Sequence, residues 1–277
     1  MPNQPEGALQ PNGADASHTS HAGLRACLFD LDGVITQTAV LHAAAWKQMF
    51  DAFLADPARA GGPQQPFTDA DYQRYVDGRP RFDGVRTFLA ARGITLPEGE
   101  DDDPPDAVTV HGLGNRKNEL VVAAIARGEV TVYEGSVRFL HAVRAAGLRT
   151  AVVSSSANTV DVLRSVGLAD QFDARVDGVV AKERGLPGKP APDTFVAAAR
   201  DLGCTPAEAV VFEDALAGVA SGRAGGFALV VGVDRSDPGD DAHGAALRDH
   251  GADVVVRDLA DLDVAALRPA VRSGGAS

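Results

Sequence analysis

Six short apolar runs, most of them separated by helix-like segments, restrict the fold of this chain more than any other feature. The runs span Leu24–Phe29, Leu148–Val153, Phe172–Val176, Ala209–Phe212, Phe227–Val233 and Asp253–Val256. Alternation of short buried strands with helices is typical of a parallel sheet covered by helices. The sequence therefore predicts an α/β fold with a parallel-sheet core. With 277 residues, 45% of them hydrophobic, the chain can bury such a core and a smaller domain as well.

The stretch between the first two runs is far too long for one crossover helix. It contains four amphipathic segments and two loop-like segments: Val40–Leu54, Asp69–Val76, Gly84–Arg92, Asn115–Ala126, Gly61–Pro66 and Pro97–Asp106. We therefore expect residues 38–130 to form an inserted helical domain, and residues 23–37 and 131–265 to form the α/β core. An insertion directly after the first strand would overhang the carboxyl edge of the sheet, where a lid belongs.

Both ends of the chain have the composition of solvated tails. Residues 1–22 are rich in Pro, Gly, Ser, Asn and His, and the chain ends in Arg-Ser-Gly-Gly-Ala-Ser. We expect a disordered tail over residues 1–22 and a flexible tail over residues 266–277. The N-terminal segment lacks an apolar stretch, and no apolar run approaches the roughly 18 residues of a membrane span. These features predict a cytoplasmic protein that has no membrane partner.

The charge balance excludes one large class of partners. The formal net charge is −12, with 38 acidic against 26 basic residues, whereas binding to DNA or RNA requires clustered Lys and Arg. The two cysteines, Cys27 and Cys204, match neither a disulfide framework nor a zinc site, so we expect both to be packing residues. A monomer that acts on a small molecule is the expectation.

Two carboxylates follow the first apolar run, in the sequence Asp30-Leu31-Asp32-Gly33. A strand that ends here presents Asp30 at the carboxyl edge of the sheet, and Gly33 lets the chain turn so that Asp32 folds back. Such a pair can hold a divalent cation, or act as one nucleophile and one proton carrier. The alternative is a turn whose aspartates cap the next helix.

The second run ends in Ser154-Ser155-Ser156-Ala157-Asn158, directly before a predicted helix. Hydroxyl groups and free backbone N–H groups at a helix N-terminus form an anion cradle, although an ordinary helix cap has the same composition.

Two more polar groups follow later in the chain. Lys189 lies in a proline-stiffened loop, where an ammonium can neutralise a phosphoryl oxygen and a carboxylate together, and where a plain surface lysine is the alternative. Glu213 and Asp214 follow the fourth run and offer the hard oxygen ligands that Mg²⁺ takes. The four groups lie at strand ends in order, and this points to one site more strongly than any one of them alone.

This ordered set resembles the haloacid dehalogenase-like superfamily of phosphatases and phosphomutases, over about residues 24–260. Within it, the segments Asp30–Lys47, Arg116–Asn118 and Lys189–Asp193 look most like those of the β-phosphoglucomutase family. The resemblance implies a Rossmann-like core with an inserted helical cap. It also implies Mg²⁺ as cofactor, a sugar phosphate as substrate and β-glucose 1,6-bisphosphate as intermediate.

The resemblance also implies roles for the acidic residues. Asp30 would attack a phosphoryl group to give an aspartyl phosphate, while Asp32 would protonate the leaving sugar oxygen and later deprotonate the incoming hydroxyl. Mg²⁺ would lie between Asp30, the backbone carbonyl of Asp32 and Asp214, with Glu213 as a further or water-mediated ligand. Such chemistry is mostly positioning and charge neutralisation.

The transferring phosphate would be held by Ser154 and Lys189, as the same resemblance implies. The backbone around Ser155 and Ser156, together with Asn158, would lie alongside it.

In the family, a cap arginine holds the distal phosphate. Arg81 is the choice by position, Arg79 is the alternative, and either could instead be a solvated surface arginine.

Three residues of the inserted domain, Thr38, His42 and Lys117, match those that couple cap closure to the position of the general acid in the family. His42 lies four residues after Thr38, on the same face of the predicted helix. Trp46 is expected in the core of the inserted domain.

Departures from the family pattern leave the exact activity open. The two loops enlarge the cap, Val179–Gly188 lengthens the approach to Lys189, and Gly78-Arg79-Pro80-Arg81 replaces the usual cap signature. A sugar-phosphate phosphatase and a catalytically idle sugar-phosphate-binding module are the alternatives to the mutase.

Overall fold

The sheet confirms the predicted fold class. The computed structural model describes residues 23–237 and 239–267, so the predicted tail over residues 1–22, and residues 268–277 of the predicted C-terminal tail, lie outside the described residues. Six strands form one sheet in the order β3-β2-β1-β4-β5-β6, and every neighbouring pair is parallel. They are β1 (Ala26–Phe29), β2 (Arg149–Val153), β3 (Ala174–Val176), β4 (Ala209–Glu213), β5 (Leu229–Val233) and β6 (Val254–Val256). Their ends differ from the predicted runs by at most two residues.

Alternate residues of each strand supply two hydrophobic cores, one on each face of the sheet. Cys27 and Phe29 of β1 belong to the core under α6 (Glu134–Ala145) and α7 (Thr159–Ser165). Ala26 and Leu28 belong to the core on the opposite face. The elements that complete this second core are α8 (Gly178–Glu183), α9 (Asp193–Asp201), α10 (Leu216–Ala224) and α11 (Ala242–Asp249). Both faces are therefore covered, and the strand ends are the place left for a site.

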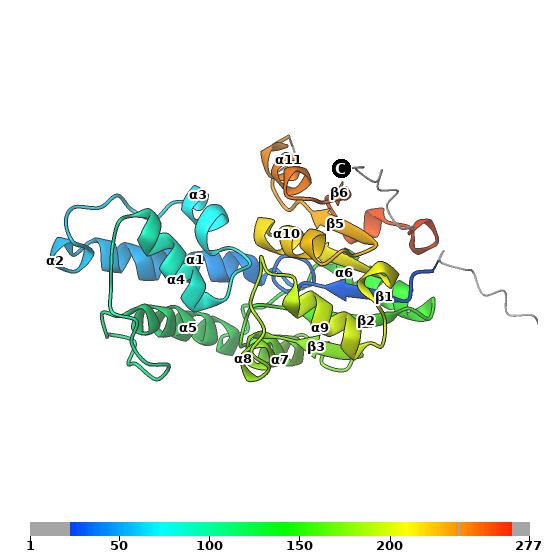
Figure 1. Ribbon diagram of the computed structural model, residues 1–277, viewed down its shortest axis with the longest axis horizontal. Coiled ribbons are helices and arrows are strands. Elements are labelled where there is room, and N and C mark those ends of the chain that lie inside the picture. Colours follow the sequence, from blue (N-terminus) through cyan, green and yellow to red (C-terminus); the bar gives the residue numbers. More distant parts are fainter. Residues whose placement is uncertain (1–22, 238, 268–277) are drawn as a thin grey trace, which may run out of the picture.

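The chain between β1 and α6 has a hydrophobic core of its own. Its elements are α1 (Thr38–Leu54), α2 (Pro57–Ala60), α3 (Asp69–Asp71), the π-helical turn η1 (Tyr72–Val76), α4 (Arg81–Ala91) and α5 (Val110–Ala126). Trp46, Phe50, Phe67 and Phe88 lie at its centre, with the rings of Phe50 and Phe88 4.2 Å apart. Figure 1 shows these helices set to one side of the sheet. We refer to residues 38–130 as the insertion.

Two short helices, α2 and α8, were not predicted. Each begins at an aspartate side chain that accepts backbone N–H groups: Asp56 accepts from Ala58, and Asp177 accepts from Val179 and Val180. Such caps stabilise a short helix. A short helix has too few residues to show the apolar periodicity by which helices are predicted. Short 3₁₀ turns, Pro206–Glu208, Leu259–Asp261 and Val264–Ala266, complete the core. Among the described residues, no helix has the length and apolar composition to cross a bilayer.

Two linkers join the insertion to the core, and they pair with each other. Gln37 N donates to Thr131 O at 2.9 Å, and Tyr133 N donates to Ile35 O at 2.9 Å. Thr36 and Val132 form an antiparallel bridge between these bonds. The outgoing linker begins directly after Asp32, so any movement of the insertion acts close to that carboxylate.

Candidate active site

Three carboxylates converge at the carboxyl edge of the central strands. The register pairs Phe29 with Phe212, and Asp30 N donates to Phe212 O at 2.9 Å, so Asp30 lies beside Glu213. One oxygen from each of Asp30, Glu213 and Asp214 lies within 4.8 Å of the others, and all three residues are buried. We call these three residues the acidic cluster.

Lys189 reaches into the acidic cluster from its loop before α9. Its Nζ lies 2.5 Å from Asp30 Oδ1 and 2.7 Å from Glu213 Oε1, and it donates to Val153 O at 3.1 Å. Burial opposes the ammonium charge, but the attraction of the two carboxylates is stronger, and the pKa of Lys189 is raised. Lys189 is therefore not a surface lysine, because its side chain is only 1% exposed.

The acidic cluster carries more negative charge than Lys189 neutralises. Burial raises the pKa of Asp30 well above its usual range although Lys189 attracts its charged form. Burial and then repulsion from Glu213 raise the pKa of Asp214 in the same way. Buried carboxylates that repel one another form a site for a cation, and their hard oxygens suit Mg²⁺. The donor set therefore fits a divalent cation.

Two glycines allow the backbone to approach the acidic cluster. A Cβ on Gly33, whose φ is +95°, would lie 1.7 Å from Asp214 Oδ2. A Cβ on Gly218 would lie 1.6 Å from Glu213 Oε1. The turn after Asp32 therefore requires glycine for its conformation and for the space that Asp214 occupies.

Asp32 points away from the acidic cluster, towards the insertion. Thr38 Oγ1 donates to Asp32 Oδ1, and Ser154 Oγ donates to Asp32 Oδ2 at 3.0 Å. His42 Nε2 lies 3.5 Å from Asp32 Oδ1, and Lys117 Nζ lies 2.7 Å from His42 Nδ1. The structure thus brings together Thr38, His42 and Lys117, which lie on two helices of the insertion, around one carboxylate of the core.

The protonation of this group follows from burial. Burial first, and then the positive charge of Lys117, lower the pKa of His42 to about 4, although Asp32 opposes the shift. Burial lowers the pKa of Lys117 to about 7, against the pull of Asp32. A neutral His42 that accepts from Lys117 at Nδ1 carries its hydrogen on Nε2, facing Asp32. Lys117 also lies 4.9 Å from the Trp46 ring centre, and Trp46 is buried as expected.

The serine segment bonds to itself and to the insertion. Ser156 N donates to Ser154 Oγ at 3.0 Å, and Asn158 N donates to Ser156 Oγ at 3.1 Å. Ser155 Oγ donates to Gly78 O at 2.7 Å, and Asn158 Nδ2 donates to Asn118 Oδ1 at 3.0 Å. The last two bonds cross from the core to the insertion, which the sequence did not predict.

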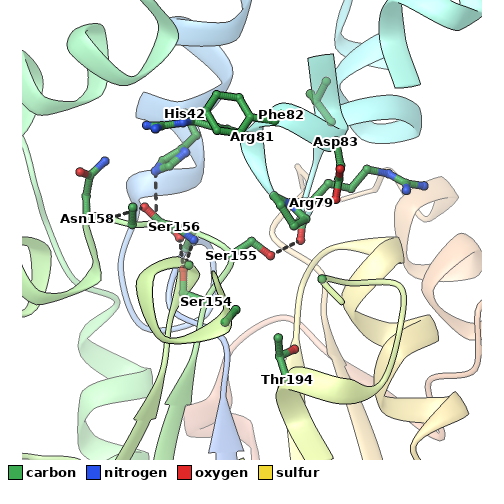
Figure 2. Close-up of a pocket in the computed structure, with 18 of the residues that line it drawn as sticks. His42, Arg79, Arg81, Phe82, Asp83, Ser154, Ser155, Ser156, Asn158 and Thr194 are labelled. Atoms are coloured by element: carbon green, nitrogen blue, oxygen red, sulfur yellow. Dashed lines mark hydrogen bonds and ion pairs between the residues drawn. The ribbon is translucent and has the colours of Figure 1, made fainter. Parts of the chain in front are cut away.

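A cavity of about 720 Å³ lies between the core and the insertion. The predicted residues that line it are Asp30, Asp32, His42, Arg79, Arg81, Lys117, Ser154, Ser155, Ser156, Asn158 and Asp214. Thr38, Lys189 and Glu213 lie behind this surface, where they contact Asp32 and Asp30. Figure 2 shows the serine segment facing Arg79, Arg81 and Phe82 across the cavity.

The two candidate arginines differ in their surroundings. Arg81 lies over the Phe82 ring, 4.7 Å from its centre, and Figure 2 shows its side chain extending towards His42. Burial lowers the pKa of Arg81 although Asp101 opposes the shift. Arg79 extends the opposite way in Figure 2. Arg81 is the one that lies on the side of the cavity where His42 and Lys117 lie.

The sequence did not single out several residues that line the cavity. Phe82 stacks on His111 at 3.9 Å between ring centres. Asp77 has its pKa raised to about 7 by burial, with a bond from Tyr72 acting in the opposite direction. Phe82 and His111 lie in the first turns of α4 and α5, and Asp77 directly follows the π-helical turn, where the Asp77-Gly78 turn was the one local signal.

A family model for haloacid dehalogenase-like hydrolases matches residues 24–226. The chain belongs to this family.

Several curated proteins are similar to most of the chain. "Beta-phosphoglucomutase" proteins of Mycobacterium bovis and Mycobacterium tuberculosis are 58% identical to this chain over 241 residues, covering 86% of this chain and 91% of theirs. A fructose-1-phosphate phosphatase of Escherichia coli is 30% identical over 211 residues, covering 76% of this chain and 95% of that protein. A crystal structure of β-phosphoglucomutase from Clostridium difficile matches with a TM-score of 0.66 and 24% identity, covering 87% of this chain and 93% of that chain, and shows the fold.

Proposed function

We propose that this chain is a Mg²⁺-dependent β-phosphoglucomutase, which converts β-D-glucose 1-phosphate to glucose 6-phosphate through β-glucose 1,6-bisphosphate. The observation that carries the proposal is the 58% identity to proteins of that name along 86% of the chain. The contact of Asp32 with Thr38 of the insertion supports it, because a mutase must align its general acid for both half-reactions.

The two aspartates divide the chemistry. Asp30 Oδ attacks the C1 phosphorus of the sugar bisphosphate, the bond from phosphorus to the sugar oxygen breaks, Asp32 gives that oxygen a proton, and glucose 6-phosphate leaves. The 6-hydroxyl of the next β-D-glucose 1-phosphate then attacks the aspartyl phosphate, Asp32 takes the proton of that hydroxyl, and the bisphosphate that forms turns over for the next attack. Lys189 and Ser154 offset the charge of the transferring phosphoryl group. Mg²⁺, held by Asp30, Asp214 and the carbonyl of Asp32, with Glu213 beside it, would supply further positive charge there.

The insertion, residues 38–130, acts in this proposal as the cap. Contacts between cap and core support a closed form: Ser155 donates to Gly78 O, and a Cβ on Gly188 would lie 2.1 Å from Pro80 Cγ. Closure excludes water from the aspartyl phosphate, which favours attack by a sugar hydroxyl. Arg81 would hold the distal phosphate as a bidentate partner. Core and cap of one chain complete the cavity, which supports a monomer, and the free thiols of Cys27 and Cys204 agree with a cytoplasmic location.

A phosphatase is the second candidate, and its support is the identity to the fructose-1-phosphate phosphatase. Both activities use the same core residues and differ in whether water reaches the aspartyl phosphate. The test is an incubation with Mg²⁺, β-D-glucose 1-phosphate and a trace of glucose 1,6-bisphosphate, in which glucose 6-phosphate and free phosphate are measured together. Glucose 6-phosphate without matching phosphate supports the mutase, and phosphate with free glucose supports the phosphatase. A binding module would form neither product and no hydroxylamine-sensitive phosphate on Asp30.

A further inference from the structure

Arg235, two residues after the end of β5, contacts both linkers of the insertion. Its Nε donates to Gly33 O at 3.1 Å, and its Nη2 donates to Val34 O at 3.2 Å, both on the outgoing linker. Nη2 also donates to Ser136 Oγ at 2.9 Å, and the guanidinium lies 3.6 Å from the centre of the Tyr133 ring, both where the returning linker meets α6. One side chain therefore holds the two linkers together on the core side of their pairing.

The remaining donors of Arg235 fix it to the core. Nη1 donates to Arg257 O at 2.8 Å and to Asp258 Oδ2 at 3.0 Å. All five N–H groups of the guanidinium thus have an acceptor, and the side chain is 15% exposed. Because all its donors are used, the planar guanidinium of Arg235 is fixed in one position. A lysine cannot replace it, because an ammonium group is a single point of charge.

The backbone atoms that accept hydrogen bonds from Arg235 lie next to the proposed catalytic and metal-binding residues. Gly33 follows Asp32 in the chain, and it passes so close to Asp214 that a Cβ would lie 1.7 Å from the carboxylate. Tyr133 N bonds to Ile35 O, three residues from Asp32, which closes the linker pair above the guanidinium. A shift of Gly33 would move Asp32 and crowd the acidic cluster together.

We propose that Arg235 is a positioning residue, which fixes the core ends of both linkers and thereby sets the position of Asp32 when the insertion closes. The kinetic part of this inference rests on the proposed function, whereas the structural part does not. Movement of the insertion then occurs beyond the Thr36–Val132 bridge, and the backbone of Asp32 keeps its position while the insertion opens and closes.

Arg257 supplies a matched control. It is an arginine at the same end of the sheet, and its guanidinium donates to Ser236 O and Asp240 O but to no atom of either linker. Arg235→Lys and Arg257→Lys both keep the positive charge. They differ in that the first loses contacts to the linkers and the second does not. Ser136→Ala removes one contact of Arg235 and gives a milder second test.

The kinetic test compares two reactions of the same protein. Aspartyl phosphorylation by acetyl phosphate needs no proton from Asp32, because acetate is a good leaving group, whereas mutase turnover needs that proton twice. Arg235→Lys should lower mutase kcat by at least about tenfold and leave phosphorylation by acetyl phosphate within about twofold of wild type. A loss of folded protein would lower both rates equally and would overturn the proposal, as would an unchanged kcat. Arg257→Lys should change neither rate.

Hydrogen exchange tests the anchor without any activity. The amides of Gln37 and Tyr133 join the linkers, so Arg235→Lys should speed their exchange by about tenfold, while Arg257→Lys and the amides of the central strands stay unchanged. Equal exchange in both variants contradicts the proposal even if the chain is a mutase. If wild type releases only free phosphate, the proposed function fails, and the kinetic comparison is made on phosphate release, because that reaction also uses Asp32.

Discussion

Thr38 donates a hydrogen bond to Asp32, so the first residue of α1 in the insertion is bonded directly to the proposed general acid in the core. The bond joins two parts of the molecule that have separate hydrophobic cores. An open insertion would break it, and Asp32 would lose one of the two hydroxyl groups that orient it. Closure and alignment of the acid are therefore one event in this account.

Thr38→Val tests this link, because it removes the hydroxyl and keeps the shape. Hydrogen bonds to a charged group contribute about 1.5–3 kcal/mol, so mutase kcat should fall by about tenfold or more, whereas phosphorylation of Asp30 by acetyl phosphate should persist. Thr87→Val is the matched control, because Thr87 Oγ1 donates within α4, to Asp83 O. Equal kcat values for the two variants would contradict the link.

The lowered pKa of Lys117 predicts that the free energy of unfolding depends on pH. Its pKa is about 7 in the folded protein, against 10.5 as the ordinary value, and burial is the main cause. Between these values the unfolded chain binds one more proton, so this residue makes the free energy of unfolding rise with pH, by up to about 1.4 kcal/mol per pH unit. Urea unfolding from pH 7.5 to 9.5 should show this slope as the difference between wild type and Lys117→Met. Lys47→Met, at a half-exposed lysine that pairs with Asp51, is the control for the loss of a lysine side chain.

Metal binding should stabilise the folded protein through the acidic cluster. Mg²⁺ should raise the melting temperature of the wild type in proportion to the logarithm of its concentration, and EDTA should reverse the shift. Asp214→Asn should abolish the shift because it replaces one carboxylate of the acidic cluster with a neutral amide. Asp234→Asn is a control, since Asp234 is also buried but bonds to Ser236 outside the cluster. A shift that survives Asp214→Asn would place the ion elsewhere.

The roles of Arg81 and Arg79 can be distinguished by comparing mutase turnover with phosphorylation by acetyl phosphate. Arg81→Ala should lower mutase kcat/KM by about a hundredfold or more, since a half-buried guanidinium partner of a phosphate is lost, and should leave phosphorylation by acetyl phosphate nearly unchanged. Arg79→Ala should have a smaller effect, because its side chain extends away from His42. The reverse order would reassign the distal phosphate to Arg79.

The strand ends were predictable because each motif is local. Asp30 and Glu213 each follow a buried apolar run, and a parallel sheet places the ends of neighbouring strands side by side. The order of the strands then brings Lys189 to the same edge, although its contact with Asp30 spans 159 positions of sequence.

The contacts of the linkers could not be read from the sequence. Arg235 and Gly33 are 202 positions apart, and one arginine among many in this chain has no local pattern that marks it. His111 of α5 stacks on Phe82 of α4, and no helical or strand period in the sequence marks this contact between two helices. Such residues are placed by packing and not by periodicity, so their partners emerge only in three dimensions.

The most direct test of the mutase follows a labelled phosphate through one turnover. The protein, first phosphorylated with unlabelled glucose 1,6-bisphosphate, is mixed with Mg²⁺ and one equivalent of β-D-glucose 1-phosphate labelled with ³²P. In a mutase, the label passes into the bisphosphate and then onto Asp30, while the first glucose 6-phosphate is unlabelled. Label in inorganic phosphate, or labelled glucose 6-phosphate in the first turnover, would contradict it.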